Sequence, residues 1–270
     1  MVHIAINFTT KTEQKRNHRM YVRREYRYGN RIEIRKYHTC KFQGKGEKRL
    51  KRNKPTPEQV KKNNEKQAER KLFRLMANNF TADDWHVVLN YANETRPDAQ
   101  GAKRIIQRFL RKMRAWYKKN GYEFKWIMTT EWANAKNIHH HIVMNGVEGL
   151  SRAIQRIWRE VGGGGCHFTP LYEDQDFEGL AEYFVKETKK TFAEDDNPFK
   201  QRAQHSRNLK KPEERKRVLK SCEWAKDPSV SKKLQEEGYV LDKDSVTNGF
   251  DFFGFEFQEY ILIRYQEAKR

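Results

Sequence analysis

Three consecutive histidines, His139, His140 and His141, stand in the apolar segment from Ile138 to Met144. Neighbouring side chains of a β-strand point to opposite faces, so a strand here places His139 and His141 on one face and His140 on the apolar one. Glu131 ends the preceding strand-prone segment, and pairing across the short turn would bring its carboxylate to the two imidazoles. Two imidazoles and a carboxylate predict a divalent-metal site with positions open to phosphate oxygens.

A tyrosine and a lysine, Tyr183 and Lys186, stand three residues apart in a segment with helical periodicity, Phe177 to Lys190. This spacing places both side chains on one flank of a helix. A protonated phenol is a weak nucleophile, so it needs a polarised phosphate and cationic partners. Each signal alone is more often structural, and only the combination with the histidines predicts chemistry. The His-Glu-x-x-His pattern of zinc peptidases does not occur.

Together these motifs resemble those of the HUH endonucleases. His139-His140-His141 looks like their His-hydrophobic-His motif, Tyr183-x-x-Lys186 looks like their tyrosine nucleophile motif, and Glu131 stands where a third metal ligand is often found. The resemblance covers about residues 80–190. The overall layout is similar to rolling-circle replication initiator (Rep) proteins of Gram-positive plasmids, phages and integrative elements. Because the middle residue is histidine rather than plainly hydrophobic, His140 as a further ligand stays open.

The resemblance implies a reaction. A metal, Mg²⁺ or Mn²⁺, held by Glu131, His139 and His141 would polarise the scissile phosphate of single-stranded DNA. Tyr183 would attack in line, leaving a 5′-phosphotyrosine and a free 3′-hydroxyl, and Lys186 would position the oxygens. Because the phosphotyrosine keeps the energy of the broken bond, the 3′-hydroxyl can reseal the strand without ATP.

The segments that must position these residues favour an α+β fold. Strand-like and helical patterns follow in the order β-α-β-β-α-β-α from Trp85 to Lys190. This order predicts a central sheet with antiparallel pairs and with helices on one face, the HUH or ferredoxin-like palm.

A basic extension precedes this region. Arginines alternate with strand-prone residues on either side of Gly29-Asn30, which predicts a β-hairpin with Arg27, Arg31 and Arg35 near its tip. A Gly/Lys-rich link over 44–54 and a polar helix over 58–77 follow. We expect an extension over 1–78, a nuclease domain over 79–192, and a basic linker over 193–270 whose strand, Phe253 to Ile263, packs on the nuclease domain.

The charge balance indicates a polyanionic partner. Lys and Arg number 56 against 36 Asp and Glu, a net charge of +20, and 17 of the basic residues lie between Lys11 and Lys54. No run of about 18 apolar residues and no signal-peptide pattern occurs, so no membrane partner is expected. Three widely spaced cysteines give no disulfide framework or zinc knuckle, which favours a reducing cytoplasm.

The expected partners are single-stranded DNA and origin duplex DNA. On the polar side of the helix after Pro97, four basic residues are candidates for contacts with DNA: Lys103, Arg104, Arg108 and Arg111. The chain contains no GxxxxGK[ST] motif, so unwinding is expected to fall to a separate host helicase.

Two other classes of function stay open from the sequence. A relaxase or a single-strand transposase would use the same chemistry and the same motifs. A non-enzymatic nucleic-acid-binding protein would bind DNA without ever cleaving it.

Overall fold

The structure is a computed structural model of the whole chain. It describes residues 21–38, 55–133, 137–171, 177–191, 203–219, 228–251 and 255–264. The Gly/Lys-rich link over 44–54 lies outside the described residues. The chain divides into two compact units, one made of Pro57–Lys211 and the other of Met1–Thr56 together with Pro212–Arg270.

A five-stranded sheet forms the centre of the unit Pro57–Lys211, and its strand order is β6-β3-β5-β4-β7. All neighbouring strands are antiparallel. The strands are β3 (Trp85–Asn90), β4 (Trp126–Ala133), β5 (Asn137–Met144), β6 (Cys166–Pro170) and β7 (Gln204–His205). The triple-histidine strand, β5, is therefore the middle strand, and both of its neighbours can contribute side chains to a common site.

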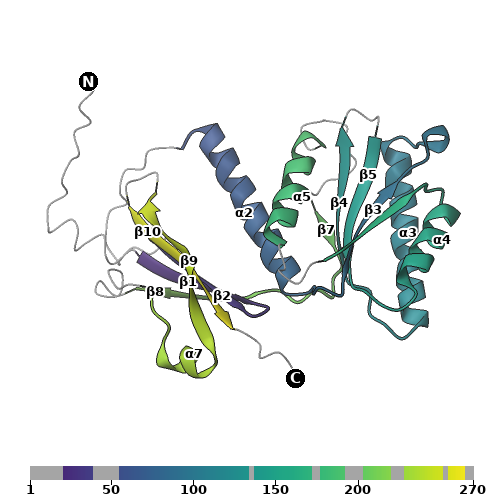
Figure 1. Cartoon of the computed structure of the whole chain (residues 1–270). Coiled ribbons are helices and arrows are strands. Elements are labelled where there is room, and N and C mark those ends of the chain that lie inside the picture. The colour runs from purple at the N-terminus through teal and green to yellow at the C-terminus, as the bar shows by residue number, and fades with distance from the viewer. Residues whose placement is uncertain are drawn as a thin grey trace. The chain divides into compact units, whose positions relative to one another are not determined.

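Helices α3 (Ala99–Lys119) and α4 (Leu150–Glu160) cover one face of this sheet (Figure 1). Their buried side chains, such as Phe109 and Trp158, share a core with Ile142 of β5. Helix α5 (Phe177–Thr191) lies over the other face, where Phe184 contacts His141, and it packs on α2 (Pro57–Ala77). The α+β class with antiparallel pairing is confirmed, but the helices occupy both faces of the sheet rather than one.

Local sequence explains where the longest of these helices begins and ends. The side chain of Asp98 caps α3 by accepting a hydrogen bond from the backbone N–H of Gly101 at 2.7 Å. After the last turn, Gly121 adopts a positive φ of 80°, which a residue with a Cβ rarely adopts. Between these ends, Ile106 and Met113 recur at helical spacing on the buried side.

The other unit holds a second antiparallel sheet, with strand order β8-β1-β2-β10-β9. The strands are β1 (Tyr21–Tyr28), β2 (Arg31–His38), β8 (Glu213–Val218), β9 (Tyr239–Phe250) and β10 (Glu256–Arg264), and a short helix, α7 (Lys232–Glu236), precedes β9. The predicted hairpin is present, with Gly29 at φ 51° in its turn. Leu234 of α7 packs against Ile32 and Ile34, which form the small core of this sheet.

The division of the chain differs from the predicted boundaries at both ends of the central region. Helix α2, expected in the extension, groups with the central sheet because it packs along α5. The C-terminal strand, expected on the nuclease domain, instead pairs with β2 of the hairpin through residues such as Tyr260, opposite Ile34. Alternating apolar residues predict a half-buried strand but do not specify its pairing partner.

Helices of the described segments were also compared with the length and hydropathy that a membrane span requires. None of them is long and apolar enough to cross a bilayer.

Candidate metal and nucleophile site

Strand alternation and register bring the three predicted ligands together. His139 and His141 are two residues apart on β5 and share a face, while Glu131 of β4 lies directly opposite His139. The ligand atoms of Glu131, His139 and His141 all lie within 4.8 Å of one another. Nε2 of His141 is 3.4 Å from a carboxylate oxygen of Glu131. Such a cluster of two imidazoles and one carboxylate is compatible with a divalent metal.

Helix α5 supplies the tyrosine on the same face. Phe184 and Val185 bury its apolar side against the sheet, and Tyr183 emerges at the border with 37% of its surface exposed. The phenol oxygen lies 3.5 Å from Nε2 of His141, and the two rings meet edge to face with their centroids 5.2 Å apart. The atom that would act as nucleophile therefore points at the ligand cluster while it remains open to solvent.

Two further side chains on this face were not predicted from the sequence. His86 of β3 places its Nε2 3.3 Å from Nδ1 of His141, on the opposite side of the ring from the cluster. Asn90, also on β3, lies directly opposite His139. Within the described segments its side-chain oxygen is buried and has no hydrogen-bond partner. The register of β3 on β5 could have suggested both residues, but the spacing of single polar residues in a strand carries no such signal.

Burial keeps the imidazoles of His86 and His141 neutral near pH 7. Burial, with His139 adding to it, lowers the pKa of His141 to about 4. Burial also lowers the pKa of His86 to about 4, with contributions from His141 and His167. Desolvation disfavours the charged imidazolium, and a neutral imidazole is the form that binds a metal. His141 can therefore accept a cation without first losing a proton.

His140 takes no part in the cluster, because strand alternation turns it to the opposite face. It is fully buried between Tyr91 and Thr130, with 2.9 Å from Nε2 to the Tyr91 oxygen and 2.9 Å from Nδ1 to the Thr130 oxygen. Both ring nitrogens are thus occupied by hydroxyl groups. Burial lowers its pKa to about 3, with smaller contributions from the two neighbouring histidines. The middle histidine acts as a polar core residue.

The basic residues predicted to contact DNA are not gathered at this site. Lys186 is exposed one helical turn from Tyr183. The four candidates on α3 lie on the helix that covers the opposite face of the sheet, and Arg104, Arg108 and Arg111 are exposed there. Any contact that they make with DNA would be made away from the ligand cluster.

The three arginines of the hairpin are also divided between two faces, here of the other sheet. Cross-strand pairing places Arg31 opposite Tyr28 and Arg35 opposite Arg24, which share one face, while Arg27 belongs to the other. Arg35 is held by Glu259, with 2.8 Å from its Nε to the carboxylate. The predicted cluster at the hairpin tip is therefore not formed as one surface.

Comparison with known protein families gives a match over the region of the site. Residues 84–192 match the model of a family described as replication-associated protein ORF2. The matched segment is less than half of the chain, and it contains all three cluster residues as well as Tyr183 and Lys186. Neither the curated proteins nor the solved structures gave a match. The family match supports a role in replication.

Proposed function

We propose that this chain cuts and rejoins single-stranded DNA at a replication origin, with Tyr183 as nucleophile, and thereby initiates rolling-circle replication. The observation that carries the proposal is the convergence of three atoms. Nε2 of His141 lies 3.4 Å from the carboxylate of Glu131 and 3.5 Å from the phenol oxygen of Tyr183. The replication-associated family match over the same residues supports the biological setting.

The cluster residues would hold the cation. The imidazoles of His139 and His141 and the carboxylate of Glu131 present one nitrogen or oxygen donor each, which leaves positions for phosphate oxygens. Mg²⁺ or Mn²⁺ bound here would supply the Lewis acidity that makes the phosphorus electrophilic. The orphaned side-chain oxygen of Asn90, directly across from His139, fits a site that binds a further polar group.

The transesterification balances without another reactant. The oxygen of Tyr183 forms a bond to phosphorus while the bond from phosphorus to the 3′ oxygen breaks, and the phenol proton is balanced by the proton that the 3′ oxygen gains. The product is a 5′-phosphotyrosine and a free 3′-hydroxyl. Reversal by that hydroxyl reseals the strand. Lys186, exposed on the same helix, would offer its ammonium group to the phosphate charge in the transition state.

The relaxase and transposase alternatives share this chemistry and differ in the DNA that is cut. A nucleic-acid-binding protein without activity would have no use for a phenol aimed at a ligand cluster. The exposed arginines of α3 are proposed to contact the DNA backbone outside the nick site, because they lie across the sheet from Tyr183.

The test uses a pool of single-stranded oligonucleotides that tiles the replicon encoding this chain. Each oligonucleotide is prepared with a label at either its 3′ or its 5′ end and is mixed with the full chain in Mn²⁺ or EDTA. We expect a covalent adduct, resolved on a denaturing gel, that carries only the 3′ label and disappears in EDTA.

Two variants sharpen the result. Tyr183→Phe should abolish the adduct, whereas Tyr122→Phe, at an exposed tyrosine of the same unit, should leave it unchanged. An adduct that survives in Tyr183→Phe would remove the proposed nucleophile. DNA binding without any adduct across the pool would favour the binding-protein class.

A further inference from the structure

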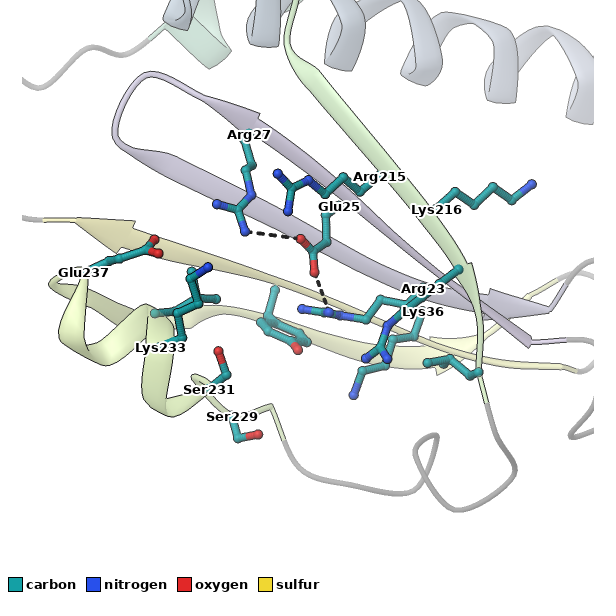
Figure 2. Close-up of a pocket in the computed structure, with 14 residues that line it drawn as sticks. Arg23, Glu25, Arg27, Lys36, Arg215, Lys216, Ser229, Ser231, Lys233 and Glu237 are labelled. Atoms are coloured by element: carbon teal, nitrogen blue, oxygen red, sulfur yellow. Dashed lines mark ion pairs between the residues drawn. The ribbon is translucent and has the colours of Figure 1, made fainter.

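A pocket of about 710 Å³ lies on the second sheet, in the unit that does not contain Tyr183. Strands β1, β2, β8 and β10 contribute residues to it, and α7 and the segment before it contribute the rest (Figure 2). Seven of its 14 lining residues are Lys or Arg, and only Glu25 and Glu237 are acidic. Its size falls within the range of about 300–1,000 Å³ that is common for ligand sites.

The register of the sheet explains how the positive charge collects. Arg23 of β1 pairs with Arg217 of β8 on one side and with Lys36 of β2 on the other. Directly opposed residues share a face, so three cations stand in one row across three adjacent strands. Like charges in opposed positions destabilise a sheet. A row that costs stability in the folded chain is accounted for by an anionic partner.

The acidic residue within the pocket organises this charge but does not cancel it. Glu25 stands two residues from both Arg23 and Arg27 on the same face of β1, and it forms ion pairs with both (Figure 2). One carboxylate thus holds two guanidinium groups side by side. Arg215, in register with Glu25 on β8, keeps 60% of its side chain exposed and pairs with Glu213 instead.

The opposite wall of the pocket carries hydroxyl groups and another cation. Ser229, Ser231 and Lys233 are exposed and come from α7 and the residues before it. Leu234 anchors this segment on the apolar half of the same sheet face. The basic half, over β8 and β1, is left open between the helix and the strand edge.

From this arrangement we propose that the pocket binds the phosphodiester backbone of nucleic acid, as a second DNA-contacting site distinct from the metal and nucleophile site. Alternate residues of a strand are about 7 Å apart, on the scale of one nucleotide step, so the two rows that start at Arg217 and Arg215 suit consecutive phosphates. Guanidinium groups bind phosphate oxygens through paired hydrogen bonds. Backbone contacts of this kind position a protein on DNA without reading sequence.

The proposal does not depend on the nicking chemistry, so it is tested in EDTA. The full chain is titrated against a fluorescein-labelled 20-base-pair duplex and a 20-nucleotide oligodeoxythymidine, with anisotropy followed from 0.05 to 0.4 M NaCl. Arg217→Gln should lower the slope of log K against log salt by about 0.9 on the duplex or 0.7 on the single strand. At 0.1 M salt this corresponds to a loss of affinity of roughly fivefold to eightfold.

Arg215→Gln with Arg217→Gln should double the change in slope. Both side chains are exposed on an edge strand, so the fold does not depend on them. Lys243→Gln removes the same single charge from an exposed position of the same unit outside the pocket, and it should change affinity less than twofold.

Three outcomes would overturn the proposal. Unchanged salt slopes for the double variant on both DNA probes would do so, as would an equal loss in Lys243→Gln. Polyglutamate that displaces the oligonucleotides at equal charge concentration would indicate an acidic protein partner instead. Failure of the nicking assay leaves all these readouts intact, so the two proposals can fail separately.

Discussion

The phenol oxygen of Tyr183 lies 3.5 Å from Nε2 of His141, the same nitrogen that lies 3.4 Å from the carboxylate of Glu131. The helix that carries the tyrosine and the strand that carries the histidine are thus held in a relationship in which nucleophile and metal ligands face a common point. Phe184, the residue next to the tyrosine, fixes this relationship by packing against both His86 and His141.

Glu131→Gln should weaken Mn²⁺ binding to the full chain by about tenfold or more, because a charged ligand becomes a neutral one. Isothermal titration of the chain with MnCl₂ measures this directly, without DNA. Glu94→Gln, at an exposed position in the loop after β3, is the matched control and should bind Mn²⁺ as the wild type does. Equal affinities in all three proteins would show that the cluster does not hold the metal.

His86→Ala should lower Mn²⁺ affinity by about 10–100-fold although His86 is not one of the cluster residues. When Nε2 of His141 faces the cation, its Nδ1 carries the proton and donates it to Nε2 of His86 at 3.3 Å. His86→Gln keeps an acceptor and should recover part of the loss. His167→Ala, at an exposed histidine on the neighbouring strand, should have no such effect. A loss in His167→Ala as large as that in His86→Ala would argue against orientation through this hydrogen bond.

His140 should make the fold sensitive to acid. Its folded-state pKa of about 3 lies below the unfolded value of about 6.5, so the unfolded chain binds the extra proton first. Its neutral form contributes fully above pH 6.5, and stability is lost as the pH falls from 6.5 toward 3, by about 3 kcal/mol at pH 4. Urea unfolding of His140→Gln should show lower stability at pH 7 and a flatter dependence between pH 6.5 and 4. A parallel pH dependence in wild type and variant would contradict this assignment.

Gly163→Ala should destabilise the fold by about 1–3 kcal/mol. A Cβ at this position would lie 2.1 Å from the ring of Trp158, which is fully buried in the core between α3, α4 and the sheet. Gly165→Ala is the control, since a Cβ there meets nothing within 4 Å among the described atoms. Urea midpoints of the two variants make the comparison. Equal midpoints would mean that the glycine run serves as a hinge and is not required for packing.

Much of the fold follows from local patterns. The strand and helix over the ligand and tyrosine motifs, β5 and α5, were predicted because apolar periodicity and motif spacing coincide there. Strand β8 was missed because its residues, Glu213–Val218, are all exposed and nearly all charged, so no alternation marks them. Its strand conformation comes from pairing with β1, an interaction that spans almost the whole chain.

The candidate site divides in the same way. Alternation along β5 was sufficient to separate His140 from His139 and His141. The proximity of His86 depends instead on the register of β3 against β5, and the chain between them includes all of α3 and β4. The pocket on the second sheet needed the pairing of β8 with β1, which no spacing of residues could have predicted.

The central claim is that Tyr183 becomes covalently joined to DNA. Trypsin should release Glu160–Lys186 as one peptide, and this peptide contains two tyrosines, Tyr172 and Tyr183. The adduct formed in Mn²⁺ is digested with nuclease and trypsin, and the peptide is fragmented in a mass spectrometer. The account predicts a residual 5′-nucleotide on Tyr183 alone. A nucleotide on Tyr172, or on a peptide from elsewhere in the chain, would contradict it.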